Sequence, residues 1–429
     1  MQVRSADNYK NISRYEFDNG LVLLAKPSAA LPIVSFRGCI RGGALAEEEG
    51  QSGLSKMVCL LLKAGTPARS AVAIADELDF MGTSLQFSPH HDALFFSLSC
   101  LKKYFEKSLD TAADLLFHSD FPVHEIERIR RTALASLKRK ADQPGQVAAD
   151  RFNESVYRGH PYRLSLDGYD QTLQLLTRED FLLFHKKNIS PENMILTATG
   201  DFDPDDLLKF VHRYFDLQAA DEHRGQWPEV KKNDFKEIHF IPRDITQANI
   251  CMGNVAAKRK SDDHYASLMM NYILGGGGLT SRLTHCIRTQ KGLAYSVYSS
   301  MSKRVLGGSF FVSMQTKTEN AGFAVQMIRD ELRRIQDTQV TDGEIQDAKN
   351  FFKGHFPFRI ETIENESAYI EMSEFYGLGL DYLDREAECI DGVSKADIQL
   401  TARKYLNPDT FVLSVAGNKR ELESQFKDR

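Results

Sequence analysis

Two short segments contain residue types that are common in phosphate-binding or metal-binding sites. The run Gly275–Gly278 stands before a predicted helix, as phosphate-binding loops do. No Gly-Lys-Ser/Thr follows it, and Ser281 occupies the last glycine position of G-x-G-x-x-G, so we interpret the run as a flexible turn. His90, His91 and Asp92 are metal-binding residue types, but neighbours on a strand point to opposite faces, so they do not predict a metal site.

The spacing of the cysteines does not predict a disulfide framework. There are six, spread along the chain with no C-x-x-C pair, which favours reduced and mostly buried thiols. A hydrolase that uses Cys59 as its nucleophile is one hypothesis, although such a thiol needs a nearby base and a lowered pKa. The apolar neighbours Met57, Val58 and Leu60 predict that Cys59 is buried instead.

A stronger pattern lies in residues 53–66, Gly-Leu-Ser-Lys-Met-Val-Cys-Leu-Leu-Leu-Lys-Ala-Gly-Thr. The segment resembles the active-site helix of the pitrilysin/insulinase zinc peptidases, the inverzincins, in which H-x-x-E-H supplies two zinc ligands and the general base. The frame of that motif is kept at Gly53, Leu54, Leu62, Gly65 and Thr66. Its chemistry is not kept, since Lys56 and Leu60 stand at the histidine positions and Cys59 replaces the glutamate.

The third zinc ligand of that family is a glutamate about 76 residues after the second histidine, and Ser136 occupies this position here. Catalytic zinc needs three protein ligands with N, O or S donor atoms. A lysine ammonium and a leucine side chain offer no lone pair, and a serine hydroxyl is a poor ligand. The resemblance therefore implies a degenerate site, with no metal or other cofactor on this chain. We expect residues 54–62 to form a core helix.

The second half of the chain keeps more of the family pattern. Ser281-Arg282-Leu283 and the stretch from Arg288 to Ser296 resemble the family motif S-R-L-…-L-R-x-x-x-G-L-A-Y-S. In that motif an Arg and a Tyr seven residues apart project toward the zinc site of the paired half, and the resemblance assigns this role to Arg288 and Tyr295. A guanidinium fork and a phenolic O–H suit a substrate carbonyl and the charge that develops on its oxygen. The alternative is a surface ion pair for Arg288 and a sheet-packing role for Tyr295.

The resemblance also implies where a peptide binds. The matching family segment is an edge strand that pairs with the substrate backbone, here Gln86, Phe87 and Ser88. Pro89 removes one amide donor at this point, which weakens such pairing. The glycines at the turn correspond to a substrate-handling loop of non-catalytic processing-peptidase subunits, here Gly275, Gly276, Gly277 and Gly278.

The elements that must position these residues occur twice. A capping box [ST]-x-x-[DE] opens a predicted helix at Thr177 and again at Ser394. Each helix is followed by an X-Pro turn and a β-branched or apolar strand, at 194–200 and 411–417. The three features share one offset of 217 residues, which indicates an internal duplication.

The duplication predicts an α+β fold of two tandem homologous domains. The domains are expected at 1–216 and 237–429, joined by a linker at 217–236 that shows no hydrophobic period. Each should pack its helices on one face of a largely antiparallel sheet, the α/β roll that the family resemblance implies.

Composition limits the classes of partner and compartment. The formal charge of −5 gives no electrostatic basis for nucleic-acid binding. A hydrophobic content of 42% and a charged content of 26% are those of an ordinary globular protein, and no segment is apolar for long enough to insert in a membrane. The polar residues 1–17 do not predict a signal peptide, so we expect a cytoplasmic protein, or a periplasmic one if a signal was removed.

Together these patterns favour a non-catalytic subunit of a heterodimeric zinc metallopeptidase. A homologous partner with an intact H-x-x-E-H would hold zinc, and this chain would bind unfolded peptide and supply Arg288 and Tyr295 to the partner's site. The alternative is a non-proteolytic scaffold of a larger assembly, because the family also contains core subunits of that kind. Retention of the Arg/Tyr pair favours the first hypothesis.

Overall fold

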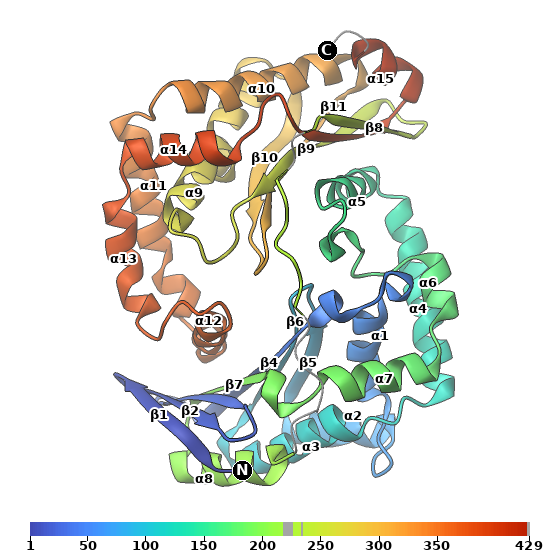
Figure 1. Cartoon of the computed structure of the whole chain (residues 1–429), viewed down its shortest axis with the longest axis vertical. Coiled ribbons are helices and arrows are strands. Elements are labelled where there is room, and N and C mark those ends of the chain that lie inside the picture. Colours follow the sequence, from blue (N-terminus) through green and yellow to red (C-terminus); the bar gives the residue numbers. More distant parts are fainter. Residues whose placement is uncertain (218–225, 233–234, 427–429) are drawn as a thin grey trace. The chain divides into compact units, whose positions relative to one another are not determined.

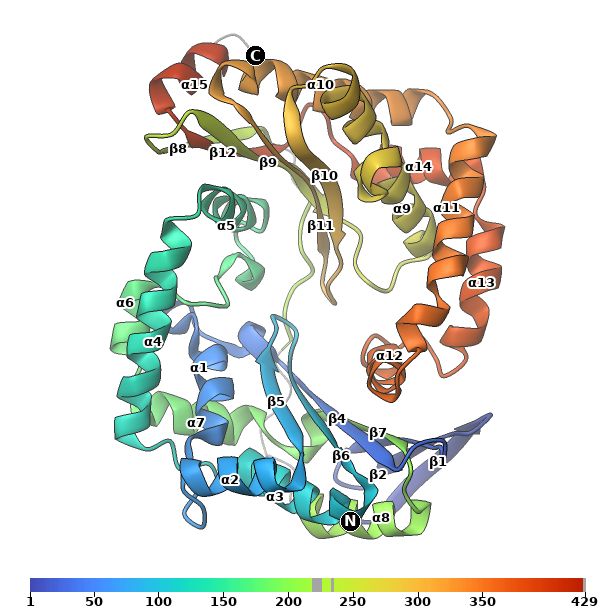
Figure 2. The same ribbon diagram turned by 180° about the vertical axis from the view of Figure 1, so that it is seen from behind.

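The computed structural model describes residues 1–217, 226–232 and 235–426. These residues form two compact units, each built on one β-sheet with helices against it (Figures 1 and 2). The interpretation of 217–236 as a linker falls in part on residues outside this description, 218–225 and 233–234. Within the described residues, none of the helices has the length and apolar content that a membrane span requires.

The first unit contains a seven-stranded sheet in the order β1-β2-β3-β7-β4-β6-β5. Neighbouring strands are antiparallel except β3 and β7, which are parallel. The strands are β1 (Val3–Tyr9), β2 (Ile12–Phe17), β3 (Val22–Pro27), β4 (Ile33–Arg41), β5 (Ser84–Pro89), β6 (Ala93–Leu101) and β7 (Met194–Gly200).

The second unit contains a five-stranded sheet in the order β10-β11-β9-β12-β8. Here β8 and β12 are the parallel pair and the other neighbours are antiparallel. The strands are β8 (Glu237–Pro242), β9 (Gln247–Ala256), β10 (Ala294–Ser302), β11 (Gly308–Lys317) and β12 (Val412–Gly417).

Five strands of each sheet have the same arrangement, β3-β7-β4-β6-β5 in the first and β8-β12-β9-β11-β10 in the second. The predicted α+β class and the internal duplication are therefore confirmed. Both capping boxes are formed, with Thr177 at the start of α7 (Arg178–Asn188) and Ser394 at the start of α14 (Lys395–Tyr405). The two additional strands, β1 and β2, are not predicted from the sequence, because β1 is exposed along nearly its whole length and β2 buries only its two end residues.

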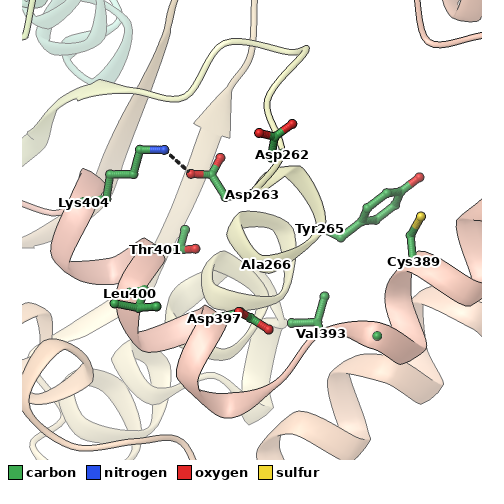
Figure 3. A pocket seen from close by; sticks show the side chains of 11 residues that line it. Asp262, Asp263, Tyr265, Ala266, Cys389, Val393, Asp397, Leu400, Thr401 and Lys404 are labelled. Carbon is green, nitrogen blue, oxygen red and sulfur yellow. Dashed lines mark hydrogen bonds and ion pairs between the residues drawn. The ribbon is translucent and has the colours of Figure 1, made fainter.

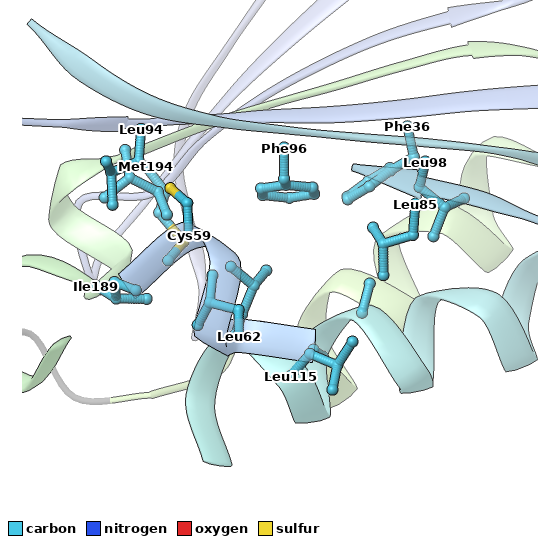
Figure 4. Close-up of a cluster of buried hydrophobic side chains, with 14 of the residues drawn as sticks. Phe36, Cys59, Leu62, Leu85, Leu94, Phe96, Leu98, Leu115, Ile189 and Met194 are labelled. Atoms are coloured by element: carbon cyan, nitrogen blue, oxygen red, sulfur yellow. The ribbon is translucent and has the colours of Figure 1, made fainter. Parts of the chain in front are cut away.

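The main core of the first unit lies between its sheet and a layer of helices. Large apolar side chains from both layers meet there, among them Phe36, Phe96, Leu62 and Leu115 (Figure 4). The helices of this unit are α1 (Leu54–Leu61), α2 (Ala71–Met81), α3 (Phe105–His118), α4 (Val123–Ala141), α6 (Asp170–Leu175), α7 and α8 (Pro204–Phe215).

The second unit repeats this construction. Ile250 and Met252 of β9 and Phe310 of β11 enter a core with residues from the helical layer. Its helices are α9 (His264–Asn271), α10 (Ala321–Asp337), α11 (Asp342–His355), α13 (Tyr382–Gly392), α14 and α15 (Lys419–Phe426). Two π-helical segments, η7 (Tyr272–Gly276) and η9 (Thr284–Gln290), follow α9.

Each sheet also carries one helix from the other half of the chain, on the face opposite its main core. α5 (Pro144–Val156) packs on β9 and β12, where Asn249 faces Gly145, whereas Ala248 and Ile250 enter the core. α12 (Ile363–Phe375) packs on β4 and β7, where Ile370 forms a separate cluster with Cys39.

The compact units follow this exchange of helices. The first comprises Met1–Leu137, Leu164–Gln226 and Pro357–Leu383, and the second comprises Lys138–Arg163, Trp227–Phe356 and Asp384–Arg429. The sequence division at 216 and 237 describes the repeat, whereas the contacts divide the chain at additional points. The expectation of helices on one sheet face accounts for the main cores but not for α5 and α12.

Candidate functional site

The helix that corresponds to the zinc motif is fixed at its start by a buried carboxylate. Its N-cap, Gly53, has φ of 96°, in the left-handed region that favours glycine. Glu47 accepts hydrogen bonds from the N–H groups of Gly53 (3.0 Å) and Ser55 (2.7 Å), which a helix N-terminus leaves without partners in the helix. Burial raises the pKa of Glu47 to about 7. Sequence reasoning missed Glu47 because nothing in its spacing marks it as a cap.

Lys56 and Leu60 lie one turn apart on α1, at the positions of the two family histidines. The Nζ atom of Lys56 lies 2.6 Å from Oδ1 of Asp167, and both side chains are about one third exposed. Leu60 is 46% exposed. This face of α1 therefore presents an ion pair and an aliphatic side chain where the family presents two imidazoles.

The other two positions do not complete a zinc site. Cys59 is 4% exposed within the main core, and burial raises the pKa of its thiol to about 12 (Figure 4). Ser136 is an exposed residue of α4. In the ranges 1–217, 226–232 and 235–426, no three His, Cys, Asp or Glu side chains gather in a group that could hold a metal ion. The residues present do not fit zinc, and a thiol this deeply buried does not fit a nucleophile.

Arg288 and Tyr295 are brought together. Arg288 lies on η9 and Tyr295 at the start of β10, and a turn with Gly292 at φ of 63° connects them. The guanidinium carbon of Arg288 lies 4.8 Å from the centroid of the Tyr295 ring, a cation–π contact. Tyr295 is 84% exposed. The two side chains are thus in contact with the tyrosine in solvent, which excludes a sheet-packed Tyr295, and their role toward a partner's site stays a prediction.

A β-bulge accounts for the exposure of Tyr295. The pairing of β10 with β11 shifts between Ala294 and Ser296, so Tyr295 is the extra residue. Val297 and Ser299 point to the buried side of β10, and regular alternation would place Tyr295 on that side as well. The bulge turns the tyrosine out of the sheet and toward Arg288.

An ion pair anchors the segment that carries Arg288. Arg282, which is 10% exposed, contacts Glu344 through Nε–Oε1 (2.5 Å) and Nη2–Oε2 (2.8 Å). Glu344 is also part of the capping box of α11 with Thr341, and its pKa is lowered to about 2 although burial opposes the shift, because Arg282 and Thr341 bind its carboxylate. Thr284 of η9 donates to the carbonyl of Val297 in β10 (3.3 Å). The Ser-Arg-Leu motif was the sequence signal for this anchor.

At most positions of the run Gly275–Gly278, the surrounding atoms leave no room for a side chain. A Cβ on Gly275 would lie 2.6 Å from the backbone nitrogen of Ser299, and one on Gly277 would lie 2.8 Å from the carbonyl oxygen of Tyr272. Gly278 has φ of 64° and open space around it. The run therefore ends η7 against β10 and then turns, which confirms a turn and leaves substrate contact as a prediction.

Gln86, Phe87 and Ser88 lie on β5, the last strand of the first sheet. The Nζ atom of Lys63 donates to the carbonyl of Leu85 (3.0 Å), so this carbonyl points away from β6. In an edge strand the backbone N–H and C=O groups of every second residue point away from the neighbouring strand. Phe87 and Pro89 therefore present theirs on the same side as Leu85, but Pro89 has no N–H. β5 is thus an edge strand with a shortened free edge, and its pairing with a peptide stays a prediction.

A separate pocket of about 560 Å³ lies in the second unit between α9 and the α13–α14 region (Figure 3). Asp263 and Lys404 form an ion pair of 2.6 Å at one side of it, and Val393 and Leu400 supply apolar surface. None of the residues assigned above to metal, Arg/Tyr or peptide positions lines this pocket. It is therefore distinct from the candidate site.

Comparison with known proteins points to one family along most of the chain. Residues 24–169 match the model described as insulinase (peptidase family M16), and residues 175–352 match the peptidase M16 inactive domain. An uncharacterised zinc protease of Mycobacterium tuberculosis is 26% identical over 86% of this chain and 85% of its own length. A protein of Helicobacter pylori described as a non-peptidase homologue is 25% identical over 91% of this chain and 90% of its own.

A solved structure shares the fold. It is described as a peptidase M16 inactive domain from Pseudomonas fluorescens, and it superposes with a TM-score of 0.89 at 22% identity, covering 95% of this chain and 98% of that one. The match extends over both sheets, so the two-unit architecture is that of the solved relative.

Proposed function

Because this chain belongs to peptidase family M16, the insulinase or pitrilysin family, and has lost that family's zinc motif, we propose that it is the non-catalytic subunit of a two-chain metallopeptidase. The partner is a homologous chain with an intact H-x-x-E-H that holds the zinc. This chain binds the unfolded peptide and supplies Arg288 and Tyr295 to the partner's site. It carries no metal or other cofactor itself.

The observation that carries the proposal is the contrast between the two sites. At the metal positions the chain has Lys56 paired with Asp167, and a buried Cys59. At the Arg/Tyr position a bulge and a half-buried ion pair hold an exposed tyrosine beside a guanidinium. A protein that only builds a scaffold has no use for a tyrosine exposed in this way.

The two side chains have defined tasks in this proposal. Arg288 donates N–H groups to a peptide carbonyl, and the Tyr295 O–H donates to the same oxygen as negative charge develops on it. The backbone edge at Gln86, Phe87 and Ser88 aligns the peptide by strand pairing. The turn at Gly275–Gly278 contacts the peptide through its exposed part. The unpaired state of all six cysteines favours a reducing compartment, which supports a cytoplasmic location.

Recovery of the tagged chain from its source cells, followed by native mass spectrometry with metals retained, tests the pairing. A complex with one similar-sized chain and one zinc supports the proposal. A zinc-free monomer or homodimer contradicts it and favours the scaffold. One zinc on this chain alone contradicts the interpretation of the degenerate site.

Activity of the reconstituted pair tests the two donors. Arg288→Ala and Tyr295→Phe should each lower kcat by about 10²–10³-fold, as loss of one donor to a developing oxyanion does. Lys291→Ala removes an exposed charge near Arg288 and should leave the rate unchanged. Full activity in both donor variants would reject their proposed role.

A further inference from the structure

Tyr298 is a second exposed tyrosine on β10, three residues beyond Tyr295. It is 46% exposed and lies on the sheet face opposite the core that Val297 enters. On this face its cross-strand neighbour is Ser313 of β11, and the next pair along the ladder is Ser300 with Phe311. Small serines therefore lie beside two aromatic rings.

The aromatic rings continue from the strand pair to α5. The ring of Tyr298 meets that of Phe311 edge-on, with centroids 6.3 Å apart and planes at 75°. Phe311 in turn lies 6.0 Å from Phe152 of α5, which is buried. We call Tyr298 and Phe311 the aromatic shelf. Phe152 forms its wall, and Ser300 and Ser313 leave space beside the rings.

We propose that the aromatic shelf binds an aromatic or branched aliphatic side chain of the peptide held by Arg288 and Tyr295. The inference rests on the proposed peptide-binding function and adds a side-chain preference to it. The shelf continues directly from the Arg/Tyr pair along β10. Three residues of an extended chain span about 10 Å, so the bound side chain belongs to a residue two or three positions from the carbonyl at Arg288.

The chemistry of the shelf selects this class of side chain. Tyr298 packs edge-to-face with Phe311 and is still 46% exposed, so an aromatic ring or a branched aliphatic group placed against it removes apolar surface from water. A charged side chain would lose hydration there without gaining an ion pair, since the neighbours of Tyr298 on this face of the two strands carry no charge: Ser296, Ser300, Phe311, Ser313 and Gln315.

Peptide binding to the full-length chain tests the inference without the partner. The probe is a fluorescein-labelled, otherwise polar twelve-residue peptide with two phenylalanines, and its counterpart has alanines at both positions. We expect the phenylalanine peptide to bind about tenfold tighter by fluorescence anisotropy, which corresponds to 1.4 kcal/mol. Tyr298→Ala should reduce this preference to less than twofold, and Tyr298→Phe should keep it.

Two further variants separate the possible failures. Phe323→Ala removes an exposed aromatic from α10 and should change neither affinity. If the wild-type chain binds both peptides equally and Arg288→Ala weakens both, the shelf is rejected while the peptide-binding function stands. If the wild-type chain binds neither peptide, both the shelf and the peptide-binding function are rejected. Circular dichroism of Tyr298→Ala establishes that the variant is folded.

Discussion

Arg37 of β4 binds Glu371 of α12, with 3.0 Å between Nε and Oε2, although 334 positions separate the two residues. The ion pair lies where the exchanged helix meets the first sheet, and Arg14–Glu374 and Lys26–Glu366 lie along the same helix. Glu371 is 1% exposed. Its second oxygen has no hydrogen-bond partner among the described residues. Polar contacts from three basic side chains of the sheet therefore link α12 to the first unit, beside the small apolar cluster of Ile370.

Glu371 should make stability depend on pH. Burial raises the pKa of Glu371 from 4.5 to about 7, so between these values the folded chain retains a proton that the unfolded chain has lost. The free energy of unfolding then falls as pH rises from about 4.5 to 7 and levels off above. Glu371→Gln should reduce that fall by roughly 2–3 kcal/mol, measured by urea unfolding at pH 5 and pH 7.5.

Glu361→Gln, at an exposed position before α12, is the matched control and should keep the wild-type pH dependence. Glu47, whose pKa is raised in the same direction, contributes a second part that remains in the Glu371 variant. An unchanged pH profile in Glu371→Gln would show that Arg37 keeps the carboxyl ionised.

Restoring ligands should restore zinc binding. The triple variant Lys56→His, Leu60→His and Ser136→Glu places two imidazoles and a carboxylate at the positions assigned to ligands. We expect it to bind one zinc with a Kd of about micromolar or below, by titration calorimetry and metal analysis after dialysis. The same variant with Ser136→Gln in place of Ser136→Glu lacks the carboxylate ligand and should bind zinc more weakly. Equal binding by the two would show that Ser136 is not the ligand position.

Cys59 should resist thiol reagents in the folded chain. Its pKa of about 12 and its burial leave almost no accessible thiolate at pH 8, whereas Cys389 is half-buried. Mass spectrometry after brief iodoacetamide treatment should find Cys389 labelled first and Cys59 unlabelled until the chain is unfolded. Rapid labelling of Cys59, with peptide cleavage that Cys59→Ser abolishes, would revive the nucleophile hypothesis.

Loss of the Arg282 side chain should lower the free energy of unfolding more than loss of an exposed arginine such as Arg334. Arg282→Ala leaves Glu344 and the nearby buried Glu331 without the guanidinium between them. We expect a loss of about 2–4 kcal/mol in urea unfolding. Arg334→Ala also removes an ion pair with Glu331, but Arg334 is largely exposed and the loss should stay below about 1 kcal/mol. Similar losses in both variants would show that the ion pairs of Arg282 stabilise the fold no more than a surface ion pair does.

The sequence predicted the elements whose signals are local. Capping boxes, alternating strands and the spacing of Arg288 and Tyr295 are short-range patterns, and each one appears in the structure. The bulge at Tyr295 was not predictable, because it depends on the register between β10 and β11. The exchange of α5 and α12 was missed for a related reason, since the local sequence of a helix does not specify which of the two sheets it will pack against. The burial of Glu47 likewise follows from the packing around α1.

The exchanged helices set an order of events during synthesis. The face of the first sheet that carries Arg14, Arg37 and Lys26 is covered by residues 363–375, which the ribosome makes long after β7 is complete. At roughly 5–20 residues per second, this delay lasts on the order of ten seconds or more. During that interval the sheet face that carries these three basic side chains lacks the helix that covers it in the folded chain.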